Sequence, residues 1–118
     1  MILWQGKLDP AEKLDYVMNF SGGADPLLET GEAIDSWALA VTAPAAALGL
    51  EIVESFPYAP WLSEAGDEIT LWLNVAPEFQ QNAAYLTGVV LGIEVTIVTT
   101  SSPARTRQRT FGVEVKQL

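Results

Sequence analysis

The sequence contains no cysteine and no histidine among its 118 residues. Without cysteine there is no thiolate nucleophile, disulfide or soft metal ligand. Without histidine the chain lacks the commonest general base and the commonest metal ligand. Serines have no histidine partner, and no G-x-S-x-G or phosphate-binding glycine motif occurs. We therefore expect a protein that is not an enzyme and that uses no cofactor.

Basic residues are also scarce. From Leu14 to Ala104 there is no Lys or Arg, although twelve of the acidic residues lie there, and the net charge is −9. This balance argues against binding a nucleic-acid backbone through counterion release. The basic residues gather at the two ends of the chain, where they would either orient a partner or only keep the surface soluble.

Long apolar runs are absent as well. The longest, Ala83 to Ile93, is interrupted by Thr87 and is too short to span a bilayer. The start of the chain has no charged segment followed by an apolar one, so we expect no targeting segment and no membrane contact. Apolar residues nevertheless make up 49% of the chain. That fraction is enough for one packed domain of this length.

Two groups of acids are the only candidates for an oxygen-ligand metal site. They are Asp25, Glu29, Glu32 and Asp35, and then Glu64, Asp67 and Glu68. Neither group has the spacing of a calcium-binding loop. We interpret both as solvated loop acids and predict no metal site.

The residue pattern is that of strands. Asp9 to Glu12 predicts a single capped turn, and Leu14, Tyr16, Met18 and Phe20 then alternate with other residues at strand period. Further strands are predicted over residues 33–42, 48–55, 68–75, 88–100 and 105–117. A connection is predicted over 43–47, an irregular edge over 56–63 and a short helix over 77–84. Short strands separated by Gly or Pro turns predict an all-β antiparallel sandwich of about seven strands. We divide the chain into an N-terminal arm and turn, residues 1–12, and a single sandwich domain, residues 13–118.

The last strand carries two sets of side chains on one face: Arg105, Arg107 and Arg109, then Phe111, Val113 and Val115. Arginines do not lie unpaired in an apolar core. Either a bulge near Thr110 or Gly112 shifts the register, or the strand extends past the core. In the second case the guanidinium groups form a row at roughly 7 Å spacing. That row would contact acids on a neighbouring protein or pair with acids of this chain.

Aromatic and apolar residues outside the predicted core give further contact candidates. By parity Trp37 belongs to the core, whereas Tyr58 and Trp61 lie in the irregular segment and Trp72 faces away from the core residues of its strand. Tyr58 and Trp61 would contact a protein or a sugar, or Trp61 would close one end of the sandwich. In the arm, Ile2, Leu3 and Trp4 would either enter a groove on a neighbour or fold back over their own sandwich.

Several short motifs resemble one family. A tryptophan, Trp4, precedes the pattern Lys-x-Asp-Pro-x-Glu-x-Leu-Asp-Tyr at residues 7–16. In order there follow Gly-Glu-Ala-Ile at 31–34, Gly-Leu-Glu-Ile at 49–52, Trp-Leu-Ser at 61–63, Ile-Val-Thr at 97–99, the arginines, and a Val-x-Val end. In this the chain resembles the fibre–tail adaptor proteins of tailed bacteriophages. It departs from them in a longer polar segment, 76–86, and in Pro103-Ala104, where the family has a glycine.

The resemblance implies an Ig-like β-sandwich and a structural role in the virion. Such a subunit would be present in multiple copies around the tail axis. It would link other tail or neck proteins to a tail fibre or tailspike, and it would be located in the tail or neck region after synthesis in the host cytoplasm. The alternatives are a carbohydrate- or host-surface-binding sandwich that uses Tyr58, Trp61 and Trp72, and a head cement or tail-completion protein of the same fold.

Overall fold

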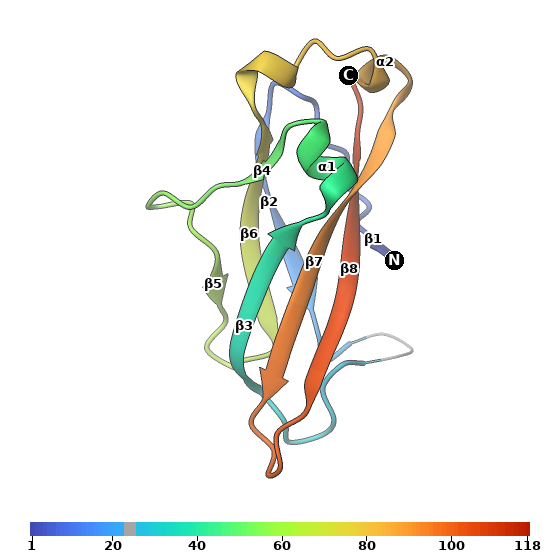
Figure 1. Cartoon of the computed structure of the whole chain (residues 1–118). Coiled ribbons are helices and arrows are strands. Elements are labelled where there is room, and N and C mark those ends of the chain that lie inside the picture. Colours follow the sequence, from blue (N-terminus) through green and yellow to red (C-terminus); the bar gives the residue numbers. More distant parts are fainter. Residues whose placement is uncertain (23–25) are drawn as a thin grey trace.

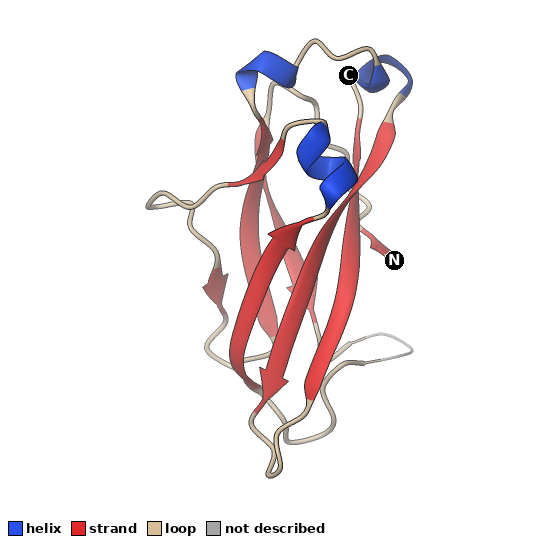
Figure 2. Cartoon of the chain, in the orientation of Figure 1, coloured by secondary structure: helices blue, strands red, loops and turns tan. Residues whose placement is uncertain are grey.

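Two β-sheets pack face to face in the computed structural model, which describes residues 1–22 and 26–118 (Figures 1 and 2). The strands are β1 (Ile2–Leu3), β2 (Lys13–Asn19), β3 (Ile34–Val41), β4 (Leu50–Ile52), β5 (Trp61–Leu62), β6 (Glu68–Val75), β7 (Val89–Thr99) and β8 (Thr106–Val115). Three short helices lie in the connections: α1 (Ala43–Ala47), η1 (Pro77–Phe79) and α2 (Ala84–Thr87). The predicted all-β sandwich is confirmed, with eight strands in the described part of the chain.

The strand order is that of an immunoglobulin-like sandwich. One sheet has the order β1-β8-β7-β3, and the other has β2-β6-β4 with β5 also paired to β6. The second, sixth and fourth strands thus take the places of B, E and D, while the third, seventh and eighth take those of C, F and G. All pairs are antiparallel except β1 with β8, which is parallel.

Alternation along the strands builds the core between the sheets. In β6 the buried side chains are Ile69, Leu71, Leu73 and Val75, each fully shielded from solvent. The β2 strand contributes Tyr16 and Met18, as its period predicts. Trp37 faces the core too, but it is only half-buried because β3 is an edge strand. The core prediction is therefore confirmed for these strands.

The β7–β8 hairpin keeps one register over its whole length. The paired residues run from Val89 opposite Val115 to Val98 opposite Thr106 without a shift. Of the two arrangements left open by the sequence, the bulge is therefore excluded. The arginines share the inner face with Phe111, and Arg109 and Arg107 lie opposite Val95 and Ile97 of β7, which are buried. The hairpin turn is the lowest point of Figure 1.

The N-terminal segment is folded back onto its own sandwich. Ile2 and Leu3 pair with Phe111 and Gly112 of β8. Leu8 is fully buried, and its backbone N–H donates to the Glu114 carbonyl at 2.9 Å. The predicted capped turn follows, with the Asp9 backbone N–H donating to Glu12 Oε1 at 2.9 Å. Residues 1–12, expected as an arm and turn, therefore contribute a strand and a core residue to the sandwich.

The region between β3 and β6 differs most from the prediction. The connection over 43–47 is the helix α1, and the strand expected over 48–55 has only three residues, Leu50–Ile52. Gly49 separates the two with a φ of +86°, and a Cβ on it would lie 2.5 Å from atoms of Phe79. A left-handed residue in such close contact ends the helix and delays the strand. The expected helix over 77–84 is replaced by η1 and α2.

Candidate functional site

Aromatic side chains gather on the outer face of the β2-β6-β4 sheet. Trp72 points outward from β6, opposite its buried neighbours Leu71 and Leu73. The Tyr58 ring packs edge-to-face on Trp72 with centroids 5.0 Å apart. Trp61 lies opposite Thr70, one diagonal step from Trp72 on the same face, and is 54% exposed. We call Tyr58, Trp61 and Trp72 the aromatic platform.

The platform has a cation and a very exposed ring beside it. Lys13 Nζ lies 4.6 Å from the centroid of the Tyr58 ring, a cation–π contact that holds the ring in place. In the turn before Tyr58, Phe56 is 94% exposed. Large apolar side chains grouped at one place on the surface are typical of interaction sites, whereas single ones are ordinary.

The position of β5 shows whether Trp61 closes one end of the sandwich, as one sequence interpretation had it. β5 runs along the edge of β6, so Trp61 lies on the side of the sandwich and does not close its end. The sequence identified Tyr58 and Trp61 as candidates because they lie in the irregular segment. The β5–β6 register places Trp61 beside Trp72, and the ring contact places Tyr58 there. A depression of about 400 Å³ adjoins them, lined by backbone and side chains of Lys13, Glu51, Ile52, Val53, Glu54, Ser55 and Asn74.

Within the predicted arginine row, Arg105 is paired with acids of its own chain. Arg105 donates from Nε to Glu32 Oε2 at 3.2 Å and from Nη1 to Glu29 Oε1 at 3.2 Å, and its Nη2 contacts Glu32 Oε1. The Arg105 hydrogen bond is the main reason why the pKa of Glu32 falls from 4.5 to about 2. The same bond raises the pKa of Arg105. Arg105 therefore pins the turn at residues 29–32 to the hairpin.

The other two arginines lie further along β8. Arg109 donates from Nη1 to the Gln108 carbonyl at 2.8 Å. Arg107 is half-buried, and no carboxylate of the described residues lies within ion-pair distance of its guanidinium. Of the two outcomes expected for the row, Arg105 therefore follows the pairing with acids of its own chain.

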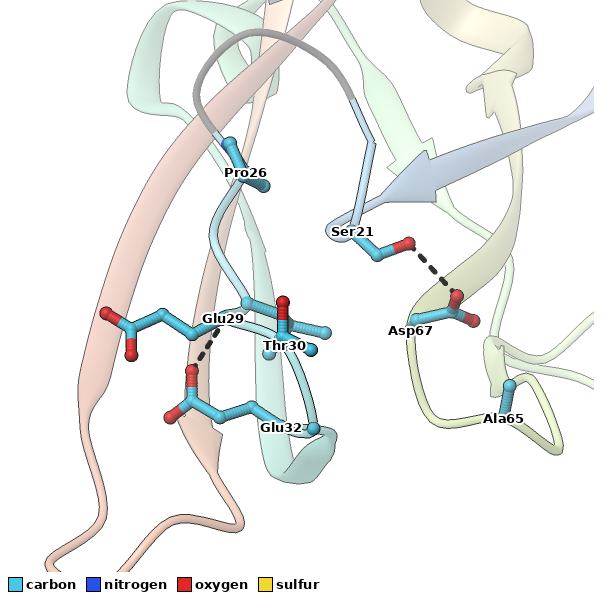
Figure 3. Close-up of a pocket in the computed structure, with 9 residues that line it drawn as sticks. Ser21, Pro26, Glu29, Thr30, Glu32, Ala65 and Asp67 are labelled. Carbon is cyan, nitrogen blue, oxygen red and sulfur yellow. Dashed lines mark hydrogen bonds between the residues drawn. The ribbon is translucent and has the colours of Figure 1, made fainter.

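An open depression adjoins the Glu29–Glu32 turn (Figure 3). It measures about 690 Å³, and its lining includes Ser21, Glu29, Glu32 and Asp67. The Ser21 hydroxyl donates to Asp67 Oδ2 at 3.1 Å, and the Glu29 backbone N–H donates to Glu32 Oε1 at 2.8 Å. Of the other two acids in that predicted group, Asp35 is exposed and Asp25 lies outside the described residues. No group of acids in the described ranges is arranged to hold a metal ion.

The N-terminal residues divide between packing and exposure. The Trp4 ring stacks on Phe111 with centroids 5.3 Å apart and packs at a tilt against Tyr16 with centroids 4.9 Å apart. Its indole N–H donates to the Val17 carbonyl at 2.8 Å. Ile2 and Leu3 remain 44% and 53% exposed. Trp4 therefore serves its own sandwich, whereas Ile2 and Leu3 keep surface that a neighbour can contact.

Sequence reasoning missed the contact of Lys13 with the Tyr58 ring and the high exposure of Phe56. Phe56 was treated as part of an irregular edge, and Lys13 as one of the terminal basic residues. The only signal for either was nearness in sequence to Tyr58 or to the first strand, because the contacts depend on strand pairing. Among the described residues no helix has the length and apolar character needed to cross a membrane.

No protein-family model matches the chain, and no curated protein matches it. The resemblance to phage fibre–tail adaptors thus remains one of short sequence motifs. The surfaces described above supply the physical part of the functional argument.

Proposed function

We propose that this chain is a structural docking subunit that binds other proteins through the aromatic platform and uses no catalytic chemistry. The observation that carries the proposal is the exposure of Trp61, at 54%, on the same face as Trp72 and Tyr58. Burial of one large side chain in a partner is worth about 1.5–3 kcal/mol. Rigid aromatic anchors of this kind dominate protein interfaces.

Within that class we assign the chain to the virion of a tailed bacteriophage, as an adaptor between tail or neck proteins and a fibre or spike. The motifs at residues 7–16 and 61–63 support this assignment, and the immunoglobulin-like strand order agrees with what they imply. Several copies around a tail axis would convert modest contacts into durable attachment, because each further contact becomes intramolecular. Ile2, Leu3 and Arg107 belong to the other sheet, where they supply secondary contacts.

Particles from cells that express tagged variants test the proposal. We expect the native chain to co-purify with tailed particles and Trp61→Ala to be lost from them. Leu86→Ala is the matched control, because Leu86 is 64% exposed on α2, away from the platform. Equal retention of both variants would contradict docking through the platform. Absence of the native chain from particles would contradict the virion assignment.

A carbohydrate-binding role is the second candidate, because the polar depression lined by Lys13, Glu51 and Asn74 adjoins the platform. Stacked aromatic rings with hydrogen-bonding neighbours suit a sugar ring. A glycan array with the purified chain separates the two roles. Binding that Trp61→Ala abolishes would favour the sugar role, and an empty array would leave protein docking.

A further inference from the structure

The two sheets have four edges, and three of them are short or obstructed. β1, the outer strand beside β8, has two residues, while β4 and β5 have three and two. The outer edge of β2 carries charged Lys13 and Asp15, and the Trp4 indole occupies its Val17 carbonyl. Proteins protect sheet edges by such means, because an open edge is a template for another strand.

The fourth edge, β3, carries one charge near its start, Asp35, and has none of these protections beyond it. It is eight residues long, and it pairs only with β7. From Ser36 to Val41 it contains no charge, proline or glycine. A register shift between Ile34 and Ser36 marks where the regular part begins. Six consecutive residues therefore form a flat, uncharged edge.

The hydrogen-bond phase of β3 identifies which backbone groups face outward. Thr42 N–H donates to the Gly92 carbonyl at 3.0 Å, so every second residue before it bonds to β7 as well. The N–H and C=O groups of Trp37, Leu39 and Val41 then point away from the sheet. Within residues 1–22 and 26–118, β3 has no strand on that side. These outward-pointing N–H and C=O groups are placed to form the hydrogen bonds of a further strand.

We propose that β3 pairs with β3 of a second copy of this chain, antiparallel, about a two-fold axis at Leu39. In that register Leu39 lies opposite itself and Trp37 lies opposite Val41, an aromatic and β-branched pair of the kind that stabilises sheets. On the outer face Ala38 lies opposite Ala40. The same patch serves both copies, as a two-fold interface requires. The β1-β8-β7-β3 sheet of one copy and that of the second copy then form one continuous sheet.

The uncharged edge suits a second copy better than a basic partner. Each chain carries a net charge of −9, so two copies approach each other only through uncharged surface. The segment from Ser36 to Val41 is such a surface. A basic partner would be attracted to acidic surface, which this edge lacks. The pairing does not depend on the proposed virion role.

Cysteine pairing tests the register, because the native chain contains no cysteine. Opposed residues 38 and 40 form a non-hydrogen-bonded pair with Cα atoms about 4.5 Å apart, within disulfide range. Residue 38 of one copy lies roughly 8 Å from residue 38 of the other, beyond that range. We expect a mixture of Ala38→Cys and Ala40→Cys full-length chains to form mixed dimers at least about tenfold faster than either variant forms its own. Equal rates would overturn the proposed register.

Charge variants test the association itself by sedimentation velocity over a range of concentrations. Ala38→Lys with Ala40→Glu places opposite charges across the axis, whereas Ala38→Lys with Ala40→Lys places like charges there. We expect the native chain to form dimers, the first double variant to dimerise at least several-fold more tightly than the second, and all three to give the same far-ultraviolet circular dichroism. A native chain that stays monomeric at every concentration, or two double variants of equal affinity, would refute the pairing.

Discussion

Replacement of Trp4 by alanine tests whether the N-terminal segment belongs to the fold. The side chain is mostly buried against Tyr16 and Phe111, and its indole N–H bonds to the Val17 carbonyl. Truncation of a buried Trp costs about 3–5 kcal/mol, so partial exposure places Trp4→Ala near the lower end, at about 3 kcal/mol. Trp4→Phe keeps most of the stacking and loses the hydrogen bond, which is worth about 1 kcal/mol.

Urea unfolding followed by far-ultraviolet circular dichroism measures these effects. A loss of about 3 kcal/mol lowers the urea midpoint by more than about 1 M for a domain of this size. Leu3→Ala is the control, because Leu3 is 53% exposed and its truncation should cost less than about 1 kcal/mol. If the free energy of unfolding of Trp4→Ala stayed within about 0.5 kcal/mol of that of the native chain, the N-terminal segment would not pack on the sandwich as described.

Three further predictions concern local contacts. The pKa of Glu32 is depressed from 4.5 to about 2, so its bond to Arg105 stabilises the fold above pH 4.5 and is lost as the pH falls toward 2. Glu32→Gln should flatten the acid side of a thermal-stability profile over that range, and an unchanged profile would disprove the pairing. Burial raises the pKa of Tyr16 from 10.0 to about 12, so this group favours the folded state below pH 10 and its contribution disappears as the pH rises through 12. Tyr16→Phe should therefore lose less stability than the native chain between about pH 10 and pH 12 in the same thermal-stability profile. Gly49→Ala should cost more than about 2 kcal/mol in urea unfolding, because the new Cβ meets Phe79. Gly31→Ala, at a similar positive φ with nothing within 4 Å, should cost about 1 kcal/mol, and equal losses would show that the contact is unimportant.

Strand periodicity was sufficient to predict most of the sandwich. The prediction for 68–75 coincides with β6, and that for 33–42 with β3 to within a residue at each end. These strands alternate cleanly because one face is buried. The same parity rule placed the arginines beside Phe111 on one face of β8.

The missed features depend on contacts between distant residues. β1 has two residues and no usable period, and it is a strand only because β8 offers an edge. Arg105 and Glu32 are 73 positions apart, so their pairing follows from the fold. The aromatic platform likewise required the β5–β6 register. The sequence named Tyr58, Trp61 and Trp72 together for the sugar-binding alternative, but only the strand register and the Tyr58–Trp72 ring contact place them on one face.

A cryo-electron-microscopy map of tailed particles that contain this chain would test the docking proposal most directly. We predict that the map places the sandwich in the tail or neck region, with Trp61 and Tyr58 buried against a neighbouring protein. A map in which the outer face of the β2-β6-β4 sheet is exposed to solvent in every copy would contradict the proposal.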